Sequence, residues 1–180
     1  TFGYGEEGKA RAQLRRILAS YDLDPWIFTR EVAIEAHVIP HSHPVLTLNT
    51  RYLDDDERQL ATFLHEQLHW FLSAPERAGS AERADGALRE LYPEVPSHEE
   101  IGTRSEDSTY LHLMVNWHEL DALAELLGED RAREILARKG YYRWIYERVL
   151  EDSEAIGRVL AEEGLLITPE AGLVVRAGGD

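Results

Sequence analysis

Residues 54–73, DDDERQLATFLHEQLHWFLS, carry the clearest structural signal in the chain. Their leucines recur at steps of four, at Leu60, Leu64 and Leu68, which is the spacing of one face of an α-helix. Asp54 can cap this helix in a capping box with Glu57, and the other early acidic residues suit the positive end of the helix dipole. Because Pro75 cannot continue a helix, we expect the helix to end just before it.

The residues before this helix predict one further helix and two strands. Apolar spacing indicates a helix over residues 8–20, a strand over 27–39 and a second strand over 45–50. In the first strand alternate apolar residues share one face, which is typical of a strand with one solvent-exposed side. Residues 40–44, PHSHP, are expected to form the turn or short loop between the strands, which could pair.

The residues after the helix predict a mainly helical second half. Residues 74–106 are rich in Pro, Gly and charge, so we expect a short helix near 80–91 and otherwise a loop that covers or shapes a cleft. Helices are then expected over 107–127, 130–139 and 141–163, each followed by a glycine, and a small hairpin over 164–179. The pattern indicates an α+β fold, a small sheet packed on a helical bundle, in one domain over residues 1–180, with 74–106 as a lid or insertion.

Composition excludes several classes of function. The chain has 34 acidic and 19 basic residues, a formal net charge of -15, and no basic stripe, which opposes binding to nucleic acid. It contains no cysteine, so disulfides and thiolate metal sites are excluded. No stretch approaches the roughly 20 apolar residues of a membrane span, and the first residues lack the apolar core of a signal peptide. A cytoplasmic location is the default expectation, and the sequence does not indicate an oligomeric state.

His65, Glu66 and His69 form the pattern H-E-x-x-H inside the predicted helix. Residues four apart lie one turn apart on the same face, so both imidazoles can hold one metal ion. Such an ion lowers the pKa of its bound water from about 15.7 towards 7 and polarises a substrate carbonyl. Glu66 is placed to act as general base, taking the water proton and passing it to the leaving group. We expect one Zn²⁺ per chain, although another divalent metal would also fit.

A catalytic zinc ion usually has three protein ligands and a water, so a third ligand is needed. The predicted helix 110–127 is apolar almost all round and is therefore expected to be buried. At about 100° per residue, its polar residues His112, Asn116 and Glu119 lie within about 60° of one another. Buried polar groups without partners cost several kcal/mol, and a facing metal site would supply partners.

From this stripe we assign Glu119 as the third ligand and His112 as the catalytic neighbour that contacts the substrate or stabilises an oxyanion. The alternative exchanges these roles, with His112 as the ligand, and a further alternative is a buried hydrogen-bond network without a metal. A tyrosine between residues 141 and 146 could donate to an oxyanion, but the pattern does not say which. His41 and His43 are expected to belong to a loop at the strand junction, the alternative being that they line a site or form a second metal pair, and His118 is expected to be an ordinary residue.

The order strand, strand and H-E-x-x-H helix, followed by E-x-x-A at residues 119–122, resembles the zincin metallopeptidases, and a glutamate third ligand makes the pattern gluzincin-like. The resemblance covers about residues 30–127. It implies a zincin-like fold in which the strand over 45–50 runs along the substrate, and the following roles: ligands His65, His69 and Glu119, with Glu66 as base. Leu123 stands where gluzincins often carry the aspartate that orients the first histidine, so another group must do this. The extended metzincin motif is excluded because Leu72 and Pro75 replace its Gly and His.

These observations predict a small zinc-dependent hydrolase of peptide or amide bonds, acting on a peptide or small molecule. One alternative is a zincin-like metal-binding protein that does not hydrolyse peptides and serves in ligand binding or protein interaction. Another is an iron-dependent enzyme that uses the same site, because sets of histidine and carboxylate ligands also suit iron.

Overall fold

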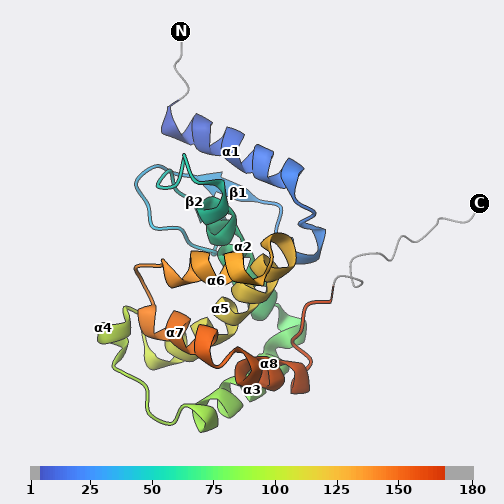
Figure 1. Ribbon diagram of the computed structural model, residues 1–180, viewed down its shortest axis with the longest axis vertical. Helices are drawn as coiled ribbons and strands as arrows, with labels where there is room; N and C mark the ends of the chain where they lie inside the picture. Colours follow the sequence, from blue (N-terminus) through green and yellow to red (C-terminus); the bar gives the residue numbers. More distant parts are fainter. Residues whose placement is uncertain (1–4, 169–180) are drawn as a thin grey trace, which may run out of the picture.

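A computed structural model of the protein describes residues 5–168, which form a helical body with a small sheet at one end (Figure 1). The longer helices are α1 (Glu6–Ser20), α2 (Asp56–Ser73), α3 (Ala78–Leu91), α5 (Glu106–Leu127), α6 (Glu129–Ala137), α7 (Arg143–Glu151) and α8 (Ser153–Glu162). The short ones are η1 (Asp24–Trp26), η2 (Pro75–Arg77) and α4 (His98–Ile101). The strands are β1 (Val32–Ile34) and β2 (Leu46–Leu48). This arrangement agrees with the α+β class.

The two strands pair in parallel, with Ala33 opposite Thr47 at the centre of the pairing. Both strands are shorter than the predicted ranges 27–39 and 45–50, because only Val32–Ile34 and Leu46–Leu48 pair with each other. On its other side, Thr47 exchanges two backbone hydrogen bonds with His41, of 2.7 and 3.1 Å. The strand β2 therefore has a neighbour on each side and is fully buried.

Helix α2 begins one residue later than a cap at Asp54 requires. The side chain of Asp55 accepts a 3.0 Å hydrogen bond from the backbone N–H of Arg58, so Asp55 is the cap and the predicted box with Glu57 does not form. Gln67, inside the H-E-x-x-H motif, also has a structural role. Its side chain accepts hydrogen bonds from the backbone N–H groups of Phe28 and Thr29. This contact ties the segment before β1 to the helix.

Helix α5 is the central element of the fold. It packs against α2, α3, α4, α6, α7 and α8, and residues such as Leu113, Val115 and Leu123 have no exposed surface. The prediction that this helix is buried almost all round is therefore confirmed. Gly128 follows it with φ at 87°, a backbone conformation that glycine adopts without the steric penalty of a Cβ.

Two predictions for the second half are corrected. The helix expected over 141–163 is two helices, α7 and α8, because the backbone leaves helical geometry at Asp152. The carboxylate of Asp152 accepts a 2.9 Å hydrogen bond from the hydroxyl of Tyr92, which links this break to the end of α3. The segment 74–106 contains η2, α3 and α4 rather than one short helix in a loop. Most of the hairpin predicted over 164–179 lies outside the described residues.

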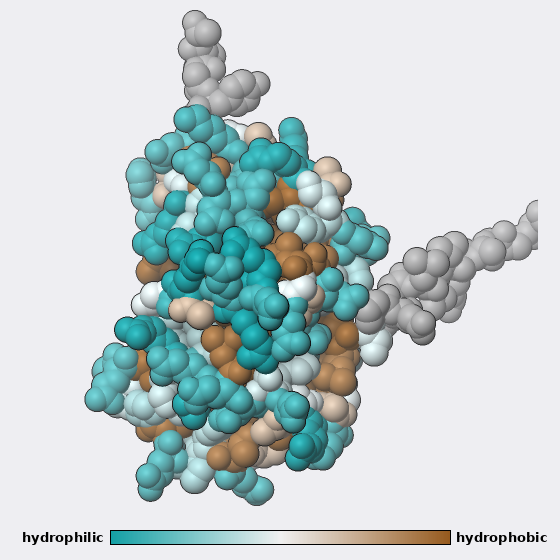
Figure 2. Space-filling model, viewed as in Figure 1, coloured by the Kyte–Doolittle hydropathy of each residue, from teal (hydrophilic) through white to brown (hydrophobic). Residues whose placement is uncertain are grey.

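The surface is largely hydrophilic on the face that Figure 2 shows, with apolar side chains in small separate groups. None of the helices within residues 5–168 combines the length and the apolar character that a membrane span requires. Most of the acidic residues lie on the surface, since Glu66 and Glu119 are the only buried ones among residues 5–168.

Candidate metal centre

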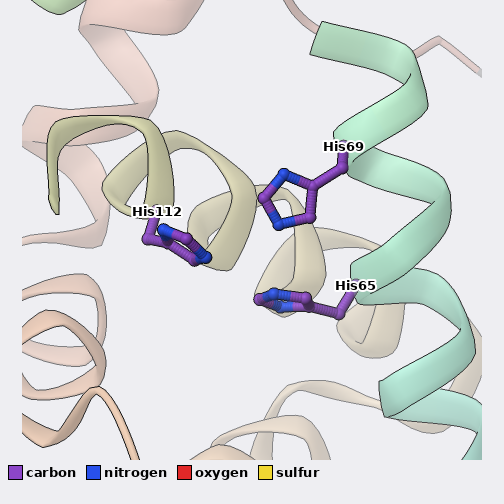
Figure 3. Close-up of side chains that lie close together, drawn as sticks. All are labelled: His65, His69 and His112. Carbon is purple, nitrogen blue, oxygen red and sulfur yellow. The ribbon is translucent and has the colours of Figure 1, made fainter. Parts of the chain in front are cut away.

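Three histidines converge where α2 packs against α5. His65 and His69 extend from α2, His112 extends from α5, and their rings turn toward one another (Figure 3). One nitrogen from each ring lies within 4.8 Å of the others, and the ring centroids are 5.0–5.6 Å apart. His65 and His112 are buried and His69 is half-buried. The group could hold a single metal ion.

Hydrogen bonds behind two of these rings determine which nitrogen is free. The Nδ1 of His65 lies 3.1 Å from Oε2 of Glu119, and the Nδ1 of His112 lies 2.6 Å from the backbone carbonyl oxygen of Ser108. A carboxylate or carbonyl oxygen can only accept, so each Nδ1 carries the proton. Each Nε2 then keeps its lone pair, the arrangement commonly found for metal-binding histidines.

Burial also favours the metal-binding form of the histidines. Burial, together with the neighbouring His65, lowers the pKa of His69 to about 2 and that of His112 to about 4. Because a metal binds the neutral imidazole, such rings need lose no proton before they bind.

Glu119 lies behind His65 and outside the histidine group. Its Oε2 accepts hydrogen bonds from His65 and from the hydroxyl of Tyr146 at 2.8 Å, and its Oε1 accepts one from Nζ of Lys139 at 2.7 Å. Burial would raise the pKa of Glu119, but the charge of Lys139 and the hydrogen bond from His65 outweigh it, so the pKa is well below its usual value. The structure thus does not bring our first choice of third ligand into the group. It brings in His112, the alternative.

Lys139 and Tyr146 were missed as members of the site. In the sequence, Lys139 is only the last residue of a predicted helix, and Tyr146 is one of several aromatic residues. Both side chains are buried, and both donate to Glu119. The signal that could have revealed Lys139 is the buried carboxylate itself, because a buried charge needs a partner of opposite charge.

Glu66 is 6% exposed and lines a cavity together with His65. Burial raises the pKa of its carboxyl, an effect that the nearby His65 partly opposes. A carboxylate with a raised pKa binds and releases protons closer to neutral pH, as a general base requires.

Two cavities meet at this site. The first has a volume of about 310 Å³ and is lined by Ile39, Pro40, Asn49, Arg51, Tyr52, Thr62, His65, Glu66, Gly102, Tyr141 and Tyr142. The second has a volume of about 520 Å³ and is lined by Pro40, His41, Ser42, His43, His65, Glu66, His69, Leu72, Ser73, Arg104, Ser108, Leu111, His112 and Tyr142. Within the described residues, Asn49 alone of the predicted strand 45–50 lines either cavity. The segment 39–43 lies there instead, because β2 is covered on both sides.

Tyr142 lines both cavities and stands between them. Its ring centroid lies 4.4 Å from that of His112. Its backbone has φ at 51°, in the left-handed region, where a non-glycine residue costs about 1–3 kcal/mol. Strained backbone of this kind often occurs in functional sites.

The other histidines and Asn116 lie at different places relative to the three converging histidines. His41 and His43 line the second cavity, which agrees with the alternative that they line a site, and His43 also stacks on Trp70 with ring centroids 4.2 Å apart. His118 lies away from the site, as predicted. The side-chain amide of Asn116 is buried without a hydrogen-bond partner among residues 5–168, so the expectation that the whole polar stripe finds partners fails there.

No protein-family model, curated protein or solved structure was found to match this chain. The features that indicate a function are the three histidines, Glu66 and the two cavities.

Proposed function

We propose that the protein is a zinc-dependent hydrolase of peptide or amide bonds, in which His65, His69 and His112 hold one metal ion. The observation that carries this proposal is the convergence of three imidazoles beside a buried glutamate at the junction of two cavities. Three protein ligands with one open position are typical of catalytic zinc sites.

The ligand set favours zinc over iron. The residues that converge are three imidazoles. Of the two buried carboxylates nearby, Glu119 is hydrogen-bonded to Lys139, Tyr146 and His65, and Glu66 is not part of the converging group. Iron enzymes of the common facial type use two histidines and one carboxylate as ligands. Residues 5–168 do not place that set of ligands at the histidine group.

Glu66 is proposed as the general base. When bound, the metal supplies a water of lowered pKa and polarises the substrate carbonyl. Glu66 lines both cavities, so it can take a proton from one side of the scissile bond and deliver it to the leaving nitrogen on the other.

Tyr142 is the tyrosine that we propose as oxyanion donor. Its hydroxyl has no hydrogen-bond partner within the described part of the chain, and its ring lies beside His112 at the mouth of both cavities. Burial raises the pKa of this hydroxyl, so it keeps its proton and can donate to developing negative charge.

The experiment compares zinc-loaded wild-type protein with Glu66→Gln on a fluorogenic peptide library. We expect the variant to keep its zinc and to lose hydrolysis by about 10²–10⁴-fold, the usual contribution of a general base. Glu57→Gln, on the same helix but outside both cavities, is the matched control and should hydrolyse at the wild-type rate. Hydrolysis that survives in Glu66→Gln, or a zinc-loaded wild-type protein that cleaves no library member, contradicts the proposal.

A further inference from the structure

The charged residues that line the candidate site are mainly basic, whereas the chain as a whole has an excess of acidic residues. The chain has a formal net charge of -15. Yet Glu66 is the only acidic residue, within the range 5–168, that lines either cavity. The second cavity instead contains Arg104, His41 and His43. The exposed acidic side chains therefore do not line this cleft.

Arg104 has no assigned role in the packing of the fold. It is exposed, and its guanidinium forms no ion pair or hydrogen bond with any described residue. Arg89, in contrast, contacts three carboxylates, of Asp85, Glu106 and Asp107. Arg104 lines the same cavity as His69 and His112.

The backbone on the N-terminal side of Arg104 is held firmly. The backbone N–H groups of Gly102 and Thr103 both donate to the carbonyl oxygen of His98, at 2.8 and 2.9 Å. The hydroxyl of Thr103 lies 2.8 Å from that of Thr109, in the first turns of α5. The backbone before Arg104 is therefore fixed, so the ordering that accompanies ligand binding is confined to its side chain.

We propose that Arg104 binds a carboxylate group of the substrate in the cavity beside His69 and His112, so that the enzyme prefers acidic substrates. This proposal rests on the proposed metal centre. One planar guanidinium matches one carboxylate through two parallel hydrogen bonds. Ser108 lines the same cavity, and its hydroxyl offers a further donor, whereas the hydroxyl of Ser73 already donates to the carbonyl oxygen of Trp70. The negative charges elsewhere on the surface oppose this binding weakly, because salt at physiological strength screens charges beyond about 8 Å.

The test uses hydroxamates, whose metal-binding group places the rest of the molecule in the cleft. The monohydroxamates of succinic, glutaric and adipic acids are compared with butano-, pentano- and hexanohydroxamic acids, which end in a methyl group instead. Binding to the zinc-loaded protein is measured by calorimetry. At the chain length that reaches Arg104, we expect the acidic member to bind about 5–10-fold more tightly, as for a charge-assisted hydrogen bond at a partly exposed site. Arg104→Gln should abolish this preference and leave the affinity for zinc unchanged.

Arg51→Gln is the matched control, because Arg51 is an exposed arginine that lines the first cavity instead. It should keep the preference within twofold. Equal binding of acidic and neutral members at all three lengths overturns the proposal, as does a preference that depends on Arg51 and not on Arg104. If no hydroxamate binds, the metal centre is wrong and this proposal falls with it. A preference lost in Arg104→Gln, in a protein that cleaves no peptide, supports the carboxylate site and contradicts only the hydrolase.

Discussion

Two buried histidines on helix α5 differ sharply in their surroundings. His112 donates from Nδ1 to the carbonyl oxygen of Ser108 and turns its ring toward His65 and His69. His118, less than two turns later, has no hydrogen-bond partner for either ring nitrogen within residues 5–168. Its ring packs instead against the aromatic rings of Phe71 and Trp117.

The comparison shows that burial alone does not mark a functional histidine. Burial lowers the pKa of both residues, to about 4 for His112 and to about 3 for His118. A strongly shifted pKa is often used to find active sites, but here it does not separate the two. What separates them is the convergence of other ring nitrogens and the cavity in front of them. Each of the following predictions tests this difference.

The largest expected effect concerns zinc affinity. His112→Ala removes one of three proposed ligands, whereas His118→Leu changes an equally buried histidine away from the site. Loss of a group behind a ligand typically costs 10–100-fold, so we expect the loss of His112 itself to cost about 10³-fold or more. His118→Leu should stay within about threefold of wild type. Titration against a competing chelator measures both, and equal losses would show that the three histidines do not act as a ligand set.

The second effect is stabilisation by the metal. A ligand that binds only the folded state, at 100 times its Kd, raises the free energy of unfolding by about 2.7 kcal/mol. For a chain of this length, the melting temperature should rise by about 5–10 °C. Calorimetric melting with and without zinc checks this value, and a chelator should reverse the shift. His118→Leu should keep the shift and His112→Ala should lose it, so a shift that persists in His112→Ala would place the zinc elsewhere.

The third effect concerns the carboxylate behind His65. Glu119→Gln combined with Lys139→Met removes both charges of a buried pair, which avoids leaving either charge without a partner. The weaker orientation of His65 should lower zinc affinity by about 10–100-fold, less than the loss of His112. Unchanged zinc affinity in this double variant, measured by the same chelator titration, would mean that Glu119 supports the fold and not the metal centre.

The smallest effect concerns acid stability. The pKa of His118 is about 3 in the folded protein, below its ordinary value of 6.5, so the unfolded chain takes up the proton first. The contribution of neutral His118 to stability is therefore complete above about pH 6.5 and is lost as the pH falls toward 3. His118→Leu should reduce the loss of unfolding free energy between pH 7 and pH 5.5 by about 1 kcal/mol. Urea unfolding of metal-free protein measures it, and identical pH dependence in variant and wild type would contradict it.

Much of the fold was predictable because it follows from local pattern. The leucine spacing of α2 predicts a helix with one buried face. The nearly continuous apolar surface of α5 predicts a helix that is buried almost all round. The break between α7 and α8 was harder to predict from local pattern. It lies at Asp152, which accepts a hydrogen bond from Tyr92, 60 residues earlier in the chain. The length of β1 likewise depends on its pairing with β2 and not on its own alternation.

In the candidate site, too, some features follow from local sequence and others only from tertiary packing. The sequence by itself determined that His65 and His69 lie together with Glu66 beside them, because 3.6 residues per turn place side chains four apart on one face. It also determined that His112 and Glu119 share one stripe of α5. It could not decide between them, because they lie about 20° apart around the axis but about 10 Å apart along it. Only the packing of α5 against α2, together with Lys139 and Tyr146 behind Glu119, places His112 with the other two histidines.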